Sequence, residues 1–198
     1  MNQISEILYW ISTGLLIPVL ILLILFFLRS LILIGTFYGM YIHKMRFNKK
    51  FRDRIATLSR ENVRQVLGEF PSGGKLLLSE FIGKVRDSKS ERVYYEKLLS
   101  DFEVACQKDL SMSQTLAKVG PILGLMGTLI PMGPALVGLA SGDISSMAMN
   151  MQVAFATTVI GLLSGAVGFV VTQVKRRWYT ADVNNLDFIV ELLMDQKQ

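Results

Sequence analysis

Residues 119–142 read VGPILGLMGTLIPMGPALVGLASG and contain no charged side chain. Two further runs are similarly apolar, since residues 144–174 carry no charge and residues 15–42 carry only Arg29. Each run reaches the roughly 20 residues that a helix needs to cross the hydrocarbon core of a bilayer. Helices buried in a soluble bundle usually keep a polar stripe, whereas these runs offer only small hydroxyls and a few amides. The sequence therefore predicts an all-α integral membrane protein with three transmembrane helices.

The basic residues lie on one side of these runs. Sixteen Lys and Arg fall within residues 44–118 and three more at 175–177, whereas residues 1–13 and 140–147 hold two charges, both acidic. Because basic residues near the ends of spans stay in the cytoplasm, we expect the N-terminus outside and the C-terminus in the cytoplasm, across a cell inner or plasma membrane. The net charge of +5 then reflects the basic segments on the cytoplasmic side of the membrane and does not indicate nucleic-acid binding. We therefore expect no nucleic-acid partner.

The charged residues between the first two runs predict cytoplasmic extensions of the membrane helices. Pro18 predicts a bend in the first helix, and the sequence FPSGG at 70–74 predicts a turn that lacks the Lys of a phosphate-binding loop. Residues 1–6 lack the basic segment of a signal peptide, so we expect the first helix to be retained. Apolar residues recur at helical spacings, at Ile55, Leu58, Val63, Val66, Leu67, Val93, Leu98, Leu99, Phe102 and Leu110.

These observations divide the chain into six segments. They are an N-terminal segment with the first transmembrane helix (1–42), a cytoplasmic helical domain (43–117), the second transmembrane helix (118–139), a short external loop (140–147), the third transmembrane helix (148–174) and a cytoplasmic C-terminal helix (175–198).

Residues that commonly carry catalysis or bind metals are scarce. Cys106, in the predicted cytoplasmic domain, is the only cysteine, which excludes an intrachain disulfide and a Cys-based metal site. His43 is the only histidine, and it flanks a basic cluster where an interfacial role fits better than a ligand role. No paired carboxylates and no nucleophile with an adjacent base are recognisable. We therefore expect neither an enzyme nor a bound metal or cofactor.

Small residues mark one face of the second and of the third predicted helix. In each helix three glycines recur at i, i+4 and i+7, which places them on one face and lets another backbone approach closely. We therefore expect both helices to face protein more than lipid, and the added prolines to kink the second helix. The predicted packing and kink residues are Gly120, Pro121, Gly124, Gly127, Pro131, Pro134, Gly161, Gly165 and Gly168.

Three threonines place hydroxyl groups deep in the same apolar helices. Thr128 lies in the second predicted helix, and Thr157 and Thr158 lie in the third, where Thr158 stands three residues before Gly161 and is expected on the glycine face. Each hydroxyl can simply bond a carbonyl one turn earlier in its own helix, or it can line a polar pathway between helices. The residues by themselves leave both interpretations open.

The sequence around these threonines resembles the MotA/TolQ/ExbB family. Residues 117–128, AKVGPILGLMGT, are similar to that family's pattern of an alanine, a proline and then LLGLLGT. Residues 154–162, AFATTVIGL, are similar to its ALLATAIGL. The two motifs occur in the family's order and separation and follow a cytoplasmic insertion. The resemblance covers the whole architecture and is motif-specific from about residue 117 to 171.

The resemblance implies a homopentameric ring of this chain around a dimer of a single-span ExbD/TolR/MotB-like partner. That partner's transmembrane aspartate picks up and releases H⁺ or Na⁺. Threonines matching Thr128 and Thr158 line the inner face near the aspartate, and Thr157 adds a hydroxyl that favours a sodium-compatible ion pathway. The implied function is the pore or stator subunit of an ion-driven motor that turns an ion gradient into mechanical work. The alternative is an oligomeric membrane scaffold that does not conduct.

The chain departs from the family pattern at three places. Gln152 and Val153 stand where ExbB and TolQ proteins carry a glutamate, Val167 replaces a later proline, and Pro131 and Pro134 are additional. No Asp, Glu, His or Lys lies inside the three apolar runs at 15–42, 119–142 and 144–174, so the chain alone has no titratable group for a proton relay. We therefore expect a partner to supply that group.

Overall fold

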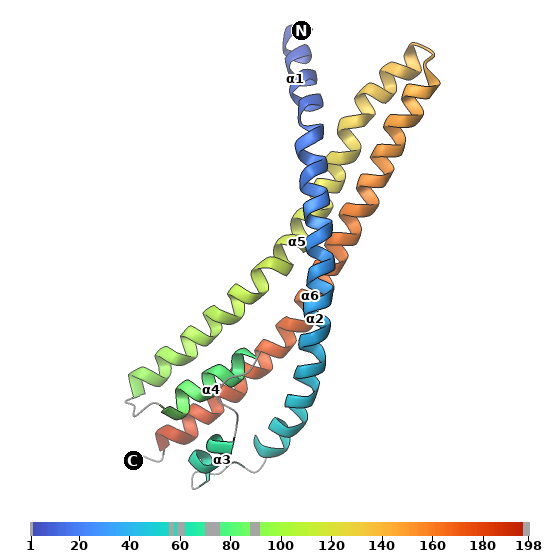
Figure 1. The fold of residues 1–198 in the computed structure, drawn as a ribbon. Coiled ribbons are helices and arrows are strands. Elements are labelled where there is room, and N and C mark those ends of the chain that lie inside the picture. Colours follow the sequence, from blue (N-terminus) through green and yellow to red (C-terminus); the bar gives the residue numbers. More distant parts are fainter. Residues whose placement is uncertain (1, 56–57, 59–61, 70–75, 88–91, 196–198) are drawn as a thin grey trace. The chain divides into compact units, whose positions relative to one another are not determined.

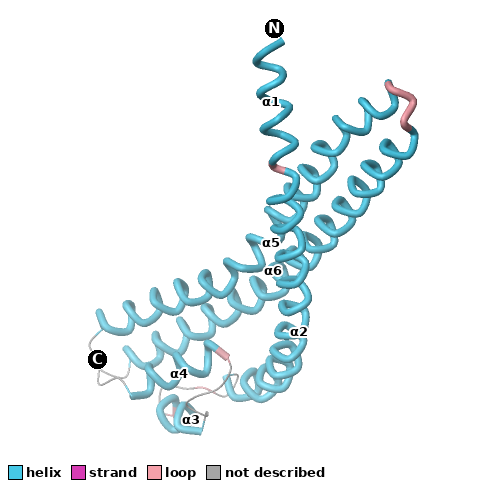
Figure 2. The backbone as a smooth tube through the Cα atoms, turned by 45° about the horizontal axis from the view of Figure 1, so that its top comes forward, coloured by secondary structure: helices cyan, strands magenta, loops and turns pink. Residues whose placement is uncertain are grey.

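The computed structural model describes residues 2–55, 58, 62–69, 76–87 and 92–195, and its regular elements are all helices. This confirms the all-α prediction for the described residues, while the predicted turn at 70–74 lies outside them. Figures 1 and 2 show the elements, which are α1 (Asn2–Gly14), α2 (Leu16–Ile55), α3 (Val63–Glu69), α4 (Leu77–Asp87), α5 (Arg92–Ala140) and α6 (Ile144–Asp195).

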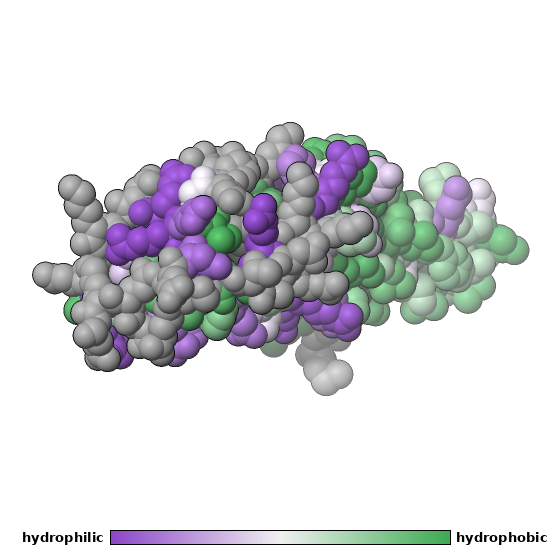
Figure 3. All heavy atoms as spheres, turned by 90° about the horizontal axis from the view of Figure 1, so that it is seen from below, coloured by the Kyte–Doolittle hydropathy of each residue, from purple (hydrophilic) through white to green (hydrophobic). Residues whose placement is uncertain are grey.

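Three stretches of helix among the described residues are long and apolar enough to cross a bilayer. They are Glu6–Phe47, Arg92–Ala140 and Ile144–Met194. Only 17%, 33% and 33% of their most apolar windows are buried within the chain, so most of this apolar surface needs lipid or protein to cover it. Hydrophobic and hydrophilic side chains gather in separate regions of the surface (Figure 3). The three predicted spans are thus confirmed as candidate membrane helices.

Each apolar run continues into charged helix without a break, as predicted. α2 extends through the basic segment to Ile55, α5 begins at Arg92 well before its apolar run, and α6 reaches Asp195. On the exposed part of α5, ion pairs between residues four apart, such as Lys97 with Asp101, stabilise the helix outside the apolar region.

The predicted first membrane segment (1–42) is interrupted at Leu15, between α1 and α2. Pro18 has no N–H, so the carbonyl of Gly14, four residues earlier, lacks its helical donor. α1 ends at this Gly14. The N–H of Leu15 donates to the carbonyl of Ile11, and that of Val19 to the carbonyl of Leu15, both at 3.1 Å. The helical hydrogen bonds on either side of the Gly14 carbonyl are thus kept. The helix is interrupted one turn before Pro18, which is the position at which this proline predicts a bend.

The connection between α5 and α6 is shorter than the predicted 140–147 loop. It consists of residues 141–143, and Gly142 adopts a φ of 76°, in the left-handed region that favours glycine. The carboxylate of Asp143 accepts a hydrogen bond of 3.0 Å from the N–H of Ser146, which caps the start of α6. This cap lets α6 begin at Ile144.

The chain forms two compact units. Unit 1 comprises Met1–Ile34 and Met112–Val171, and unit 2 comprises Gly35–Ser111 and Thr172–Gln198. In unit 1, α2 packs against the apolar part of α5 through Val19, Leu23, Leu123 and Ile130.

Unit 2 has the larger apolar core, built by α3, α4 and the charged parts of α5 and α6. Phe102, Leu186 and Ile189 are completely buried in it. The residues predicted from spacing lie in or against this core, apart from two. Val66 is buried outside the main cluster, and Val93, in the first turn of α5, is 73% exposed. Helical spacing placed Val93 on the core side, but it stands two residues before the buried Tyr95, and two residues turn a helix by about 200°, so Val93 faces away from the core.

Candidate functional site: the α5–α6 helix pair and a polar layer

α5 and α6 approach each other backbone to backbone in unit 1. A Cβ atom added at Gly161 would lie 2.6 Å from the Cα of Gly124 and 2.7 Å from the carbonyl oxygen of Gly120. Real Cβ atoms essentially never come within 3.0 Å of another heavy atom, so only glycine permits this approach. The structure thus brings these three predicted packing residues together within one chain.

The contact continues along α6 with other small groups. A Cβ at Gly165 would lie 2.6 Å from the ring Cγ of Pro121, and one at Gly168 would lie 2.5 Å from the backbone N of Ala117. Pro131 is fully buried and Pro134 half-buried inside a continuous α5. The glycine faces therefore serve the contact between α5 and α6 of one chain, and subunit contacts in an oligomer must use other surfaces.

Thr157 belongs to this contact. Its side chain is buried, and a Cβ added at Gly127 would lie 2.6 Å from its own Cβ. The hydroxyl donates within α6, to the carbonyls of Val153 at 3.0 Å and Ala154 at 2.9 Å. Thr157 fills the space that Gly127 leaves between the two helices, and its hydroxyl is not open to a pathway.

Thr128 and Thr158 are partly exposed and keep free hydrogen-bonding capacity. The Thr128 hydroxyl donates to the carbonyl of Leu125 at 2.7 Å, and the Thr158 hydroxyl to that of Ala154 at 3.1 Å. A hydroxyl has one donor and two acceptor lone pairs, so each oxygen can still accept a hydrogen bond or coordinate a cation. While these bonds persist, neither hydroxyl can also donate to a carboxylate.

α2 packs on one side of the α5–α6 pair, and Thr128 and Thr158 lie on the other. Met126 and Ile130 of α5 and Ile160 of α6 belong to the cluster with α2. Thr128 is two residues from both Met126 and Ile130, and Thr158 is two residues from Ile160. Because two residues turn a helix by about 200°, both threonines face away from α2.

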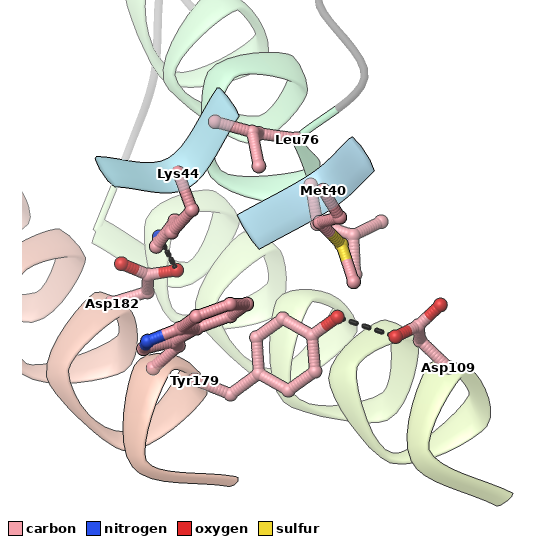
Figure 4. Close-up of a pocket in the computed structure, with 8 residues that line it drawn as sticks. Met40, Lys44, Leu76, Asp109, Tyr179 and Asp182 are labelled. Atoms are coloured by element: carbon pink, nitrogen blue, oxygen red, sulfur yellow. Dashed lines mark hydrogen bonds and ion pairs between the residues drawn. The ribbon is translucent and has the colours of Figure 1, made fainter. Parts of the chain in front are cut away.

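A polar layer joins α2, α5 and α6 in unit 2 (Figure 4). Lys44 of α2 donates to Asp182 of α6, and these side chains are only 3% and 5% exposed. Asp109 of α5 accepts hydrogen bonds from Lys175 at 2.7 Å and from the Tyr179 hydroxyl at 2.5 Å. Lys175, Tyr179 and Asp182 share one face of α6, because they stand at i, i+4 and i+7.

Burial changes the ionisation of this layer. Desolvation raises the pKa of Asp182, and the neighbouring Lys44 opposes that rise. Desolvation, reinforced by the hydrogen bond to Asp109, raises the pKa of Tyr179 well above its usual range. Desolvation, with the nearby carboxylates of Asp182 and Asp109, raises the pKa of Cys106 to about 12. Tyr179 therefore acts as a neutral donor and Cys106 as a neutral thiol.

A cavity of about 130 Å³ lies beside the polar layer in unit 2. Each charged lining group has a partner of opposite charge, since Lys44 pairs with Asp182 in the lining and Asp109 is bound by Lys175, which lies outside the lining. The other lining residues are Met40, Leu76, Leu77, Trp178 and Tyr179 (Figure 4). The cavity therefore presents no net charge to an ion.

Sequence reasoning missed the polar layer. The spacing of Lys175, Tyr179 and Asp182 was the signal that could have indicated a polar face on α6. In the part of the chain that the structure describes, no three His, Cys, Asp or Glu side chains are grouped so that they could hold a metal.

The sequence matches the MotA/TolQ/ExbB proton channel family over residues 74–187, more than half of the chain. The matched region includes all of α5, α6 as far as Asp187, and the three threonines Thr128, Thr157 and Thr158. No curated protein matches the sequence. The family consists of channel and stator subunits in membranes, not of enzymes. A match of this extent, with the three candidate membrane helices, shows that the chain belongs to the MotA/TolQ/ExbB proton channel family.

Proposed function

We propose that this chain is the pore-forming stator subunit of an ion-driven membrane motor, and that Thr128 and Thr158 line its ion pathway. The observation that carries the proposal is their common position on the side of the α5–α6 pair that α2 leaves uncovered. The family supplies the general activity of a proton channel. Thr157 is left out of the pathway, because it is buried against Gly127.

The ion-binding group comes from a partner in this proposal. The apolar runs contain no Asp, Glu, His or Lys that could change charge. Five copies of the chain surround a dimer of a single-span ExbD/TolR/MotB-like protein, whose transmembrane aspartate carries H⁺ or exchanges Na⁺ beside the two threonines. Apolar side chains next to Thr128 on α5, such as Leu125 and Leu129, are exposed and available to contact those partner helices.

The hydrogen bonds of the two threonines favour the loaded state of such an aspartate. A protonated carboxyl group can donate to the acceptor lone pairs of Thr128 or Thr158, and Na⁺ can use the same lone pairs as ligands. An ionised carboxylate needs a donor, which each hydroxyl provides only if it leaves its own carbonyl. Release of the ion therefore weakens the hydrogen bonding between the partner's aspartate and the two threonines. Each elementary charge that crosses 100 mV releases about 2.3 kcal/mol. This is enough to drive the change in hydrogen bonding one ion at a time.

The proposed orientation places the N-terminus outside and the C-terminus in the cytoplasm of a cell inner or plasma membrane. The basic residues that flank the spans on one side support it. Unit 2 then lies in the cytoplasm, and the Ser141–Asp143 connection lies outside.

A non-conducting oligomeric scaffold is the alternative. It is favoured by one observation, namely that the hydroxyls of Thr128, Thr157 and Thr158 all bond carbonyls of their own helices. In a scaffold these bonds satisfy the hydroxyls and nothing further is needed from them.

Replacing Thr128 or Thr158 with valine separates the two functions. Valine keeps the side-chain shape and removes the hydroxyl, so assembly should persist while ion flux through the complex with its partner is lost. Thr180→Val is the matched control, because the Thr180 hydroxyl also bonds a carbonyl four residues earlier but lies in unit 2. Flux is measured in reconstituted vesicles and the oligomer by native mass spectrometry. Wild-type flux in both valine variants would remove these threonines from the pathway and favour the scaffold.

A further inference from the structure

Arg29 is the single charge in the first apolar run, and it is exposed on α2 in unit 1. Its guanidinium donates to the sulfur of Met112 at 3.5 Å. Met112 stands six residues before Lys118, where the second predicted transmembrane helix begins, so Arg29 lies at the cytoplasmic end of the membrane region and not at its centre. A thioether is a weak acceptor, whereas a guanidinium carries five N–H donors in a fork that matches an anion with two oxygens. Within the described residues no carboxylate pairs with Arg29, so most of its hydrogen-bonding capacity is directed outward.

A second copy of the chain has no free carboxylate that could pair with Arg29 within the membrane. The sequence contains no Asp or Glu at residues 7–52, 110–142 or 144–181. The carboxylate nearest to Met112 along α5 is Asp109, and it is already bound by Lys175 and Tyr179. Arg29 also lies on the helix that covers the side opposite Thr128, away from the proposed pathway. An anion that pairs with Arg29 therefore has to come from a molecule other than this chain.

The surface of α2 beside Arg29 is apolar. Leu25 and Ile32, four residues before and three after, share its face and are 51% and 66% exposed, and the adjacent Leu28 is 50% exposed. A guanidinium beside a stripe of exposed leucines matches an amphiphile that has an anionic head and acyl chains.

We propose that Arg29 binds the phosphate of an anionic phospholipid in the cytoplasmic leaflet. The guanidinium donates two hydrogen bonds to phosphate oxygens, and an acyl chain lies along α2 past Leu28 and Leu25. The choice of leaflet and the separation of Arg29 from the ion pathway rest on the proposed function. The binding itself requires neither conduction nor the partner protein. Inorganic phosphate shares the head-group chemistry but cannot use the apolar stripe.

Native mass spectrometry of the detergent-purified chain, titrated with phosphatidylglycerol or phosphatidylcholine, tests this site. We expect the wild-type chain to retain phosphatidylglycerol preferentially, and Arg29→Gln to weaken that binding about tenfold, because a charge-assisted bidentate contact is lost. Arg29→Lys should keep part of the affinity. Arg92→Gln is the matched control, since it removes an equal charge from an exposed position at the start of α5 and should bind as the wild type does.

Three results would overturn the proposal. The first is equal retention of phosphatidylglycerol by the wild type and Arg29→Gln. The second is displacement of the lipid by an equal concentration of inorganic phosphate, which would make Arg29 a site for free anions. The third is a smaller oligomer of Arg29→Gln with unchanged lipid binding, which would make Arg29 a subunit contact. Because lipid binding is measured without the partner, a chain that binds the lipid but fails to conduct in the complex with its partner would refute the proposed function alone.

Discussion

Replacing Gly161 with alanine adds one methyl group where α5 and α6 meet through backbone atoms. The new Cβ would lie 2.6 Å from the Cα of Gly124, 2.9 Å from its N and 2.7 Å from the carbonyl oxygen of Gly120. All three are backbone atoms, so no change of rotamer relieves the clash. The helices must separate until the Cβ is more than 3.0 Å from the Gly124 Cα.

The separation weakens the contact along the helix pair, since Gly120, Gly124 and Gly165 depend on the same close approach. Overpacking of this kind costs about 1–3 kcal/mol, and we expect Gly161→Ala to lower the free energy of unfolding by about that amount. Gly35→Ala is the matched control, because nothing lies within 4 Å of a Cβ at Gly35. There the higher helix propensity of alanine, up to about 1 kcal/mol, should leave stability unchanged or raise it.

Reversible unfolding in mixed SDS and dodecylmaltoside micelles, followed by tryptophan fluorescence, measures both variants against the wild type. The expected result is a lower SDS midpoint for Gly161→Ala and an unchanged or higher midpoint for Gly35→Ala. An unchanged midpoint for Gly161→Ala, or equal shifts in both variants, would refute the backbone contact between α5 and α6.

Two further predictions concern unit 2 and the orientation of the chain. Asp182→Leu leaves the buried ammonium of Lys44 without its partner and should lower the free energy of unfolding by about 3–5 kcal/mol. Adding Lys44→Met should recover most of this loss in thermal melts, and additive losses would contradict the buried pair. Cys106, buried and with its pKa raised to about 12, should resist an impermeant maleimide at about pH 8 even in permeabilised cells, because the thiolate is the reactive form. The exposed Ser141→Cys should be labelled in intact cells, and labelling only after permeabilisation would reverse the orientation.

The sequence by itself determined the features that depend on residues within one helix. An uncharged run of sufficient length becomes a candidate membrane helix wherever it occurs, because lipid requires every backbone group to bond within the helix. The continuation of α5 and α6 into charged segments and the interruption before Pro18 follow from equally local causes. Helical periodicity likewise placed Gly120, Gly124 and Gly127 on one face. The family followed from short motifs within two of these helices.

Only the tertiary structure decided which faces meet. Periodicity placed Thr158 on the glycine face, yet packing buries Thr157 against Gly127 and leaves Thr158 on the side that α2 does not cover. The pair of Lys44 and Asp182 joins residues 138 positions apart. A local pattern cannot reveal such a pair, because the pairing of two buried charges depends on how α2 and α6 pack and not on the sequence around either residue.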